Sequence, residues 1–464
     1  MRALVSVSGS ELVPAKAMPA ASVPVDPAAA DAAETAAVDV TAAAARPDTG
    51  LRRTVLPNGL TVLTDTMPWV RSVALGAWVR AASVHEPREK MGVSHLLEHM
   101  VFKGTGTRSA KEIALALEVL GGSLDAYTSR EHTSFQARVL DEHVPEAADV
   151  LADIVFNPAL RQRDLELERK VVLEEISMVE DTPDDQVFEL HNAALWGTHP
   201  YGYSILGTRE SVVALGTDDQ RMLHALAYRP SQIVVAAAGN IEHDQLLDVL
   251  ERTGWLRNGG ERPHVPDVPP PRTEAARYVH VPREVGQTHV VFGTPTFAHG
   301  DPRRYTLLLA SSLVGGGMSS RLFQRVREEL GLAYSVQTFH AFHAETGMHG
   351  VYVASAPEVA SDSVAAIVEE LGRVASDGLT AEEIASGKSQ LKGQVTIAME
   401  SVNARMYRAA GAELYGEPYQ TIDEVLNLIE AIEPHEVAGV CAEFFDPARQ
   451  TVLSLGRREI AFGD

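Results

Sequence analysis

The chain has 464 residues, 45% of them hydrophobic and 22% charged, and is long enough for at least two hydrophobic cores. Its formal net charge of −23 and pI near 5.2 argue against nucleic acid as a partner, and no apolar run approaches the length of a membrane span. The charge fits an acidic, soluble surface, and it fits equally a negative cavity that attracts basic peptides. The single cysteine, Cys441, excludes a disulfide framework and a cysteine-rich zinc site, so any metal ligands must be His and carboxylate.

Residues 1–48 are rich in Ala, Val, Pro and Asp and show no sustained periodicity, which predicts a disordered tail. The stretch after Arg2 is broken by Ser, Glu and Pro, so it lacks the apolar core of a secretory signal. It is also too acidic and too poor in Arg for a mitochondrial presequence. We therefore expect a cytoplasmic protein.

Two stretches of the chain show the same order of elements on either side of a proline-rich linker. The first is predicted to contain two strands, an apolar helix, a strand after two glycines, a long helix and a closing strand, at residues 60–64, 72–79, 93–101, 121–128, 166–180 and 228–236. The second repeats this order at residues 276–281, 288–293, 305–314, 331–336, 381–400 and 445–453.

This repetition predicts an internal duplication of about 200 residues. The expected fold class is α+β, with two homologous α/β-roll domains, each a mostly antiparallel sheet packed with helices. The predicted divisions are a tail, a first domain, a linker and a second domain, at residues 1–48, 49–261, 262–274 and 275–464.

The helix predicted at residues 93–101 contains the segment His95-Leu96-Leu97-Glu98-His99. His95 and His99 are four residues apart, so both imidazoles lie on one helix face and can reach one metal ion. Glu98 can reach a water on that ion, and the order His-x-x-Glu-His is the inverted form of a zinc peptidase motif. A surface helix with two solvated histidines is the alternative, but the apolar neighbours predict a buried helix, where unpaired ionisable groups are costly.

The corresponding helix of the second half, at residues 305–314, contains no histidine. Only the first half therefore carries the residues for a metal. The second half is left to serve shape, substrate contact or assembly.

Zinc hydrolases usually have three protein ligands and an open water position, so a third ligand must lie elsewhere. The predicted helix at residues 166–180 offers several glutamates. Glu168 and Glu175 share one face, but on spacing alone Glu174 or Glu166 would serve almost as well.

The stretch from Gly92 to Thr105 resembles the pitrilysin-type inverzincin zinc peptidases, most closely their mitochondrial processing peptidase-like branch. The resemblance extends from about Arg53 to Leu455. It implies one Zn²⁺ per chain, with Glu175 as the third ligand beside His95 and His99, and with Glu168 assisting the site. It also implies that the two halves form a crescent and that two crescents enclose a chamber.

The resemblance indicates substrate-binding residues in both halves. The segment at residues 121–133 looks like the family's edge strand for substrate backbone, which implicates Asp125 and Ala126, although the family more often has Asn at the position of Asp125. Arg327 and Tyr334 match a pair that the family uses to hold substrate near the zinc. Their alternative interpretation is an exposed helical arginine and a half-buried strand tyrosine.

The resulting hypothesis is a zinc endopeptidase that hydrolyses extended peptides or presequence-like segments inside a dimeric chamber. Glu98 would be the general base, and Tyr334 or Arg327 would stabilise the oxyanion. The partner would be a copy of the chain or a related subunit. The main alternative is a non-catalytic structural or partner subunit, a role in which family members typically lose the metal-site residues. A peptide-binding chaperone that cleaves slowly is a third interpretation.

Overall fold

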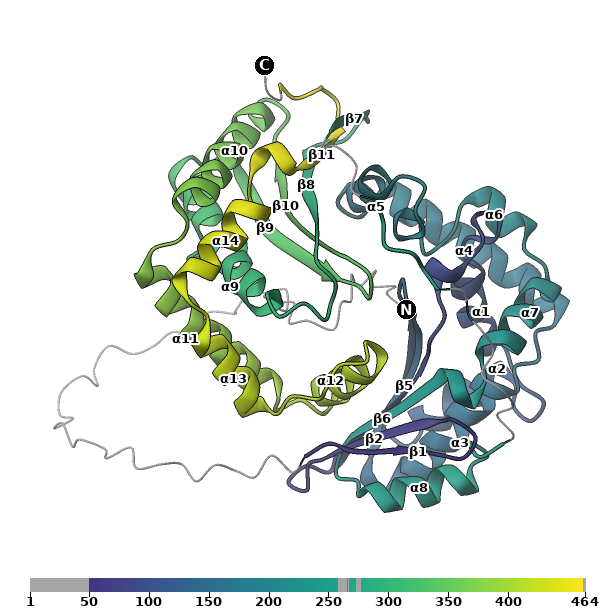
Figure 1. The fold of residues 1–464 in the computed structure, drawn as a ribbon. Coiled ribbons are helices and arrows are strands. Elements are labelled where there is room, and N and C mark those ends of the chain that lie inside the picture. The colour runs from purple at the N-terminus through teal and green to yellow at the C-terminus, as the bar shows by residue number, and fades with distance from the viewer. Residues whose placement is uncertain (1–49, 258–264, 266, 273–276, 462–464) are drawn as a thin grey trace, which may run out of the picture.

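The computed structural model describes residues 50–257, 265, 267–272 and 277–461. The tail predicted at residues 1–48 lies outside the described residues, as does part of the predicted linker. The chain folds into two lobes, each built of one sheet and several helices, and each lobe is formed mainly by one half of the chain (Figure 1).

The first sheet has six strands in the order β1-β2-β6-β3-β5-β4. Neighbouring strands are antiparallel except for β2 and β6, which run parallel. The two innermost strands are almost entirely buried, because helices cover both faces of the sheet. The strands are β1 (Arg52–Val55), β2 (Thr61–Thr66), β3 (Ser72–Val79), β4 (Ser123–Thr128), β5 (Thr133–Leu140) and β6 (Ile233–Gly239).

The second sheet repeats this topology with five strands in the order β7-β11-β8-β10-β9. Its one parallel pair, β7 with β11, corresponds to β2 with β6 of the first sheet. The α+β class and the duplication predicted from the sequence are therefore confirmed. The strands are β7 (Tyr278–Pro282), β8 (Thr288–Thr296), β9 (Ala333–Phe342), β10 (Gly347–Ser355) and β11 (Thr451–Gly456).

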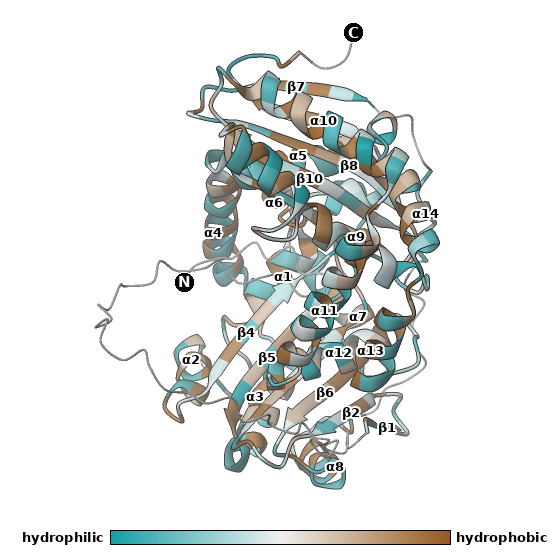
Figure 2. Cartoon of the chain, turned by 90° about the vertical axis from the view of Figure 1, so that its left-hand side faces the viewer, coloured by the Kyte–Doolittle hydropathy of each residue, from teal (hydrophilic) through white to brown (hydrophobic). Residues whose placement is uncertain are grey.

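The helices present apolar faces to these sheets and polar faces outward. Figure 2 shows hydrophobic residues concentrated on the strands, β6 and β8 among them, and hydrophilic residues on outward-facing parts of the helices. The helices of the first half are α1 (Val93–Val101), α2 (Ala110–Glu118), α3 (Val144–Phe156), α4 (Gln162–Asp181), α5 (Pro183–Trp196), α6 (Arg209–Ala214), α7 (Thr217–Ala227) and α8 (His243–Arg252). Those of the second are α9 (Arg304–Gly315), α10 (Ala360–Asp377), α11 (Ala381–Ala398), α12 (Val402–Leu414), α13 (Ile422–Ala431) and α14 (Pro434–Phe444), with a π-helix at Phe323–Glu329.

Both closing strands begin later than predicted, for the same reason. Strand β6 begins at Ile233 and β11 at Thr451, because a short 3₁₀ turn precedes each strand, at Pro230–Gln232 and at Pro447–Arg449. Proline fixes its own φ and has no N–H for a sheet ladder, so the turn occupies residues that the hydrophobic pattern assigned to the strand.

The two halves exchange helices, an arrangement that was not predicted from the sequence. Helix α5 packs on β8 and β11 of the second sheet, and Val187 is buried there against Val291 and Leu453. Helix α12 packs on β2, β3 and β6 of the first sheet, where Met406 and Trp78 share one buried cluster. The halves are thus held together by reciprocal covering of their sheets as well as by the linker.

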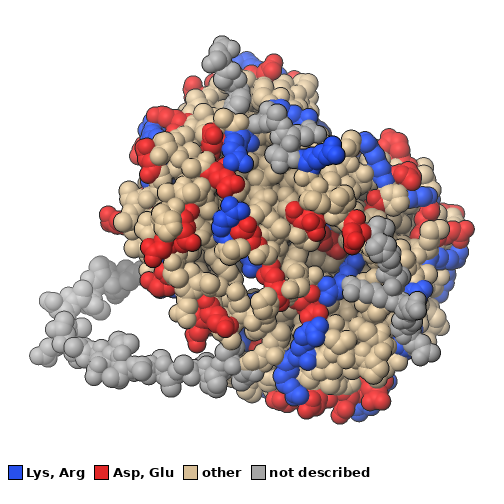
Figure 3. Space-filling view, in the orientation of Figure 1, with Lys and Arg blue, Asp and Glu red and all other residues tan. Residues whose placement is uncertain are grey.

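No helix in the described part of the chain has the length and apolarity needed to cross a bilayer. The cytoplasmic location expected from the sequence stays a prediction. Figure 3 shows acidic side chains scattered over the visible face of both lobes, with basic ones among them, rather than gathered in one patch.

Candidate metal centre

Helix α1 is fixed in place at its first residues. Gly92 precedes it with φ of 86°, and a Cβ there would lie 2.6 Å from the carbonyl oxygen of Leu206, so only glycine fits this position. The buried carboxylate of Glu86 accepts hydrogen bonds from the backbone N–H groups of Gly92 (2.8 Å) and Ser94 (2.7 Å), at the helix end that favours negative charge. The burial predicted for this helix is confirmed. Its buried residues are Val93, Ser94, Leu96, Leu97, Met100 and Val101.

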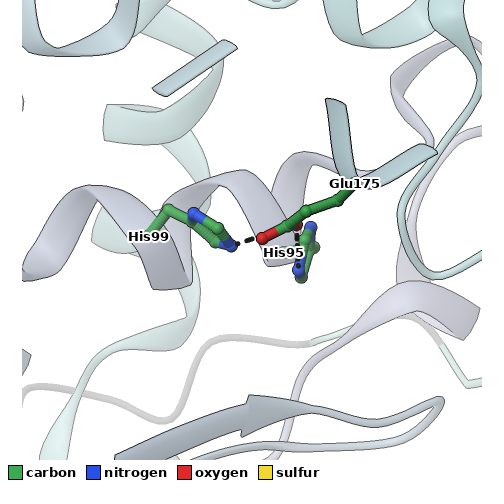
Figure 4. Close-up of side chains that lie close together, drawn as sticks. All are labelled: His95, His99 and Glu175. Carbon is green, nitrogen blue, oxygen red and sulfur yellow. Dashed lines mark ion pairs between the residues drawn. The ribbon is translucent and has the colours of Figure 1, made fainter. Parts of the chain in front are cut away.

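The remaining face of α1 turns His95 and His99 toward Glu175 on α4 (Figure 4). The Oε2 atom of Glu175 lies 3.7 Å from Nε2 of His95 and 3.5 Å from Nε2 of His99. Among the residues that the structure describes, this is the only group of three His, Cys, Asp or Glu side chains that could hold one metal ion. Their side chains are 12%, 17% and 20% exposed, so the group is sheltered but open to water and ligands.

The three donors fit a zinc ion in both spacing and chemistry. Two zinc–ligand bonds of about 2.1 Å at a tetrahedral angle place the ligand atoms about 3.4 Å apart, close to both observed separations. Burial, together with the neighbouring His99, lowers the pKa of His95 to about 3, so its imidazole is neutral and offers a lone pair. Burial raises the pKa of the Glu175 carboxyl because it disfavours the charged form. A cation at this point would stabilise that charged form.

The orientation of α4 shows which of its glutamates face the histidines, a choice that sequence spacing alone did not make. Glu168 and Glu175 lie on the side facing α1, whereas Glu166 and Glu174 are exposed on the other side of the helix. The structure therefore brings to the histidines the glutamate that the family resemblance indicates.

Glu168 lies behind His99 rather than beside the Glu175 carboxylate. Its Oε2 is 3.2 Å from Nδ1 of His99, and its Oε1 is 2.8 Å from Nζ of Lys103. Burial alone would raise the pKa of Glu168, but the bonds from His99 and Lys103 outweigh it and the pKa is lowered. Burial likewise opposes the charged form of His99, but Glu168 and the carboxylates of Glu175 and Glu98 together raise its pKa. Glu168 is thus placed to orient the His99 ring so that Nε2 faces Glu175.

Glu98 points toward the edge of the first sheet, where Thr128 Oγ1 donates a hydrogen bond to its Oε2 at 2.6 Å. Burial raises the pKa of Glu98 to about 7, against the lowering effect of Thr128 and His99. A carboxylate with a pKa near neutrality suits a general base. Thr128 and Lys103 are not among the site residues predicted from the sequence. The available signals were the position of Thr128 at the end of a predicted strand and of Lys103 one turn after His99.

Strand β4 is one of the two edge strands of the first sheet, as the edge-strand prediction requires, and it contacts α1. Asp125 is exposed on it, and its Oδ1 accepts a hydrogen bond from the backbone N–H of Ala126 at 2.9 Å. The backbone of β4 is paired with β5 on one side only within the described residues, so the other side can accept an added strand.

Arg327 and Tyr334 lie together in the second half, on the π-helix and at the start of β9. The Arg327 guanidinium stacks on the Tyr334 ring at 4.5 Å and donates to its carbonyl oxygen at 3.3 Å. Tyr334 is 78% exposed, so the half-buried tyrosine of the alternative interpretation is wrong. Among the described residues, no hydrogen bond, ion pair or ring contact joins this pair to the histidines of α1.

A duplicated α+β chain with one inverted His-x-x-Glu-His helix is the arrangement of a pitrilysin-type metallopeptidase. The signature described as Insulinase (Peptidase family M16) matches residues 61–209, and that of the Peptidase M16 inactive domain matches residues 217–391. The second signature fits the half without histidines at the corresponding helix.

Curated relatives agree with these signatures. The uncharacterized zinc protease YmxG of Bacillus subtilis is 37% identical over 395 residues, which cover 85% of this chain and 96% of that protein. An uncharacterized zinc protease of Mycobacterium tuberculosis is 40% identical over 391 residues, covering 84% and 89%. The chain belongs to the M16 peptidase family.

Solved structures support the fold. A peptidase M16 inactive domain from Pseudomonas fluorescens superposes with a TM-score of 0.82 at 18% identity, covering 89% of this chain and 98% of that one. A protease from Helicobacter pylori gives 0.81 at 20% identity, covering 88% and 99%.

Proposed function

We propose that this chain is a zinc endopeptidase that cleaves extended peptides, presequence-like segments among them. The observation that carries the proposal is the convergence of His95, His99 and Glu175 with Glu98 on the adjoining position of α1. When bound there, Zn²⁺ would lower the pKa of a water toward neutrality and polarise the scissile carbonyl. The zinc protease names of the relatives agree with this cofactor.

The side chains around the three ligands have distinct roles in this proposal. Glu98 takes the proton from the attacking water and passes it to the leaving amine. Glu168, held by Lys103, keeps the His99 ring in the orientation in which Nε2 is the ligand atom. These roles need no movement of α1 or α4.

The substrate would lie as an added strand along β4, with its backbone bonded at Asp125 and Ala126. Arg327 or Tyr334 would stabilise the oxyanion, in the same chain or in a partner chain. The exposure of Tyr334 leaves its hydroxyl available for such a contact.

A dimeric chamber, made of two copies or of this chain and a related subunit, would enclose the site. The retention of His95, His99, Glu98 and Glu175 favours a peptidase over a non-catalytic subunit, because a subunit without catalysis has no use for a general base beside three metal donors.

The deciding experiment combines metal analysis with cleavage of a peptide library by the wild type, Glu98→Gln and the exposed control Glu89→Gln. We expect one zinc per chain in all three, cleavage by the wild type and Glu89→Gln, and at least a hundredfold loss in Glu98→Gln. Full activity in Glu98→Gln would remove Glu98 as the base. A wild type that binds no zinc and cleaves nothing would favour the non-catalytic subunit.

A further inference from the structure

We propose that Thr128 is a positioning residue for Glu98 and that, through it, the edge strand β4 sets the orientation of the base. This inference rests on the proposed function. The Oγ1–Oε2 distance of 2.6 Å is in the range of a charge-assisted hydrogen bond from a hydroxyl to a carboxylate.

Among the residues that the structure describes, the Glu98 carboxylate is oriented by a single hydrogen bond. Within the described residues, the Thr128 hydroxyl is its only hydrogen-bond donor, and it binds Oε2. The other oxygen, Oε1, receives no donor in that part of the chain, so one oxygen is held while the other is left to take a proton. A glutamate has three rotatable bonds, and fixing one oxygen selects one of its rotamers.

Thr128 is itself held firmly. It is the last residue of β4 and pairs with Thr133 across the β4–β5 ladder. The turn that follows is closed by two hydrogen bonds to the carbonyl oxygen of His132, from the N–H of Ser129 at 2.9 Å and from its Oγ at 2.8 Å. The backbone that carries the Thr128 hydroxyl is therefore fixed at both the strand end and the turn.

The same turn is anchored to the second half of the chain. The Oε1 atom of Glu131 accepts a hydrogen bond from Tyr201 Oη at 2.7 Å and another from the backbone N–H of Ala344 at 2.9 Å. Ala344 lies between β9 and β10 of the second sheet. The half without metal ligands thus contributes to the placement of β4 and, through Thr128, of the base.

A consequence follows for substrate binding. A peptide that pairs with the open edge of β4 would contact the same strand whose last residue, Thr128, bonds Glu98. Because misplacement of a catalytic group by about 1 Å costs on the order of a hundredfold in rate, a base fixed by the substrate-binding strand is positioned relative to the bound peptide.

The second half supplies a matched control. Thr338 lies on β9, the counterpart of β4, and its Oγ1 donates at 2.9 Å to the carbonyl oxygen of Ser311 on α9, the counterpart of α1. This is the same strand-to-helix hydrogen bond, but it ends on a backbone carbonyl instead of a carboxylate. Thr338→Val therefore removes a comparable structural contact without touching the base.

The kinetic test compares Thr128→Val, which keeps the shape but removes the hydroxyl, with Thr128→Ser and Thr338→Val. We expect Thr128→Val to lower kcat about tenfold to a hundredfold, with KM and zinc content within about twofold of the wild type. Thr128→Ser and Thr338→Val should stay within about threefold in kcat. The proposal is overturned if Thr128→Val keeps its kcat, or if Thr128→Ser is as impaired as Thr128→Val.

Crystal structures of the wild type and Thr128→Val give a readout that needs no activity. We expect Glu98 in a single conformer bonded to Thr128 in the wild type and in more than one conformer in the variant. An unchanged, single Glu98 conformer in Thr128→Val refutes the positioning role. Absence of zinc-dependent cleavage by the wild type refutes the proposed function instead, and the crystallographic comparison still decides the role of Thr128.

Discussion

Asp65 on β2 and Arg405 on α12 form an ion pair of 3.0 Å in which the side chains are only 1% and 9% exposed. Tyr419 Oη donates to the same carboxylate at 3.2 Å. The pair joins a strand of the first half to the helix that the second half places on it. It therefore links the two lobes where α12 covers the first sheet.

Replacing Asp65 by Asn should destabilise the whole chain. The variant removes the negative charge that Asp65 places beside the buried Arg405 guanidinium, and breaking a buried pair in this way costs about 3–5 kcal/mol. The free energy of unfolding from urea titration measures the loss. Asp244→Asn is the matched control, because its pair with Arg52 at 3.0 Å is 77% and 55% exposed and should contribute less than about 1 kcal/mol. Equal effects of the two variants would show that the Asp65 pair is not buried in solution.

Glu175→Gln should lose zinc while Glu174→Gln keeps it. Of these two glutamates, only Glu175 lies on the side of α4 that faces the histidines, and a neutral amide is a poorer zinc ligand than a carboxylate. Zinc content after dialysis against a chelator of intermediate strength measures the difference. Because zinc would bind the folded state only, chelation should also lower the Tm of the wild type and of Glu174→Gln, but not that of Glu175→Gln. Retention of zinc by Glu175→Gln would remove Glu175 from the ligand set.

Glu168→Gln should weaken zinc binding by about tenfold to a hundredfold without abolishing it, the usual effect of losing a carboxylate that orients a ligand histidine. Competition with a zinc-sensitive dye measures the affinity. Glu166→Gln, on the exposed side of the same helix, is the control and should match the wild type. Complete loss of zinc in Glu168→Gln would point to direct ligation instead.

The order of strands and helices could be predicted because hydrophobic periodicity is a local property of the chain. The exchange of α5 and α12 could not, because periodicity indicates that a helix face is buried but not which sheet covers it. Val187 and Met406 are ordinary apolar positions in the sequence, and only the tertiary structure places each against the other half's sheet. The start of each closing strand was predicted too early for a related reason: the hydrophobic pattern did not distinguish the residues of the proline turn from those of the strand.

The site shows the same division between local and long-range information. His95, Glu98 and His99 could be predicted because one helical turn brings them together regardless of the rest of the fold. The choice of Glu175 over Glu174 depends on which side of α4 packs on α1. Thr128 lies 30 residues from Glu98 and reaches it only because β4 ends beside α1, a contact that no spacing rule contains.

The stability of the second half should depend on pH through Glu383, at the start of α11. Its carboxylate binds the Arg321 guanidinium at 2.7 and 2.8 Å, and the N–H and hydroxyl of Thr380 also donate to it. The bond to Arg321 outweighs burial and lowers the pKa of Glu383 from 4.5 to about 2. A lowered carboxyl pKa means that the stabilisation is fully present above about pH 4.5 and is lost as the pH falls through about 2.

Glu383→Gln should therefore be less stable than the wild type by about 1 kcal/mol at pH 7, and the difference should shrink progressively below pH 4.5. Urea unfolding at pH 7, 4 and 2.5, followed by tryptophan fluorescence and circular dichroism, measures the trend. The exposed neighbour Glu382→Gln should match the wild type at each pH. A difference between Glu383→Gln and the wild type that stays constant from pH 7 to 2.5 would mean that the helix cap acts through neutral hydrogen bonds, since a charged pair with Arg321 must weaken when the carboxylate is protonated.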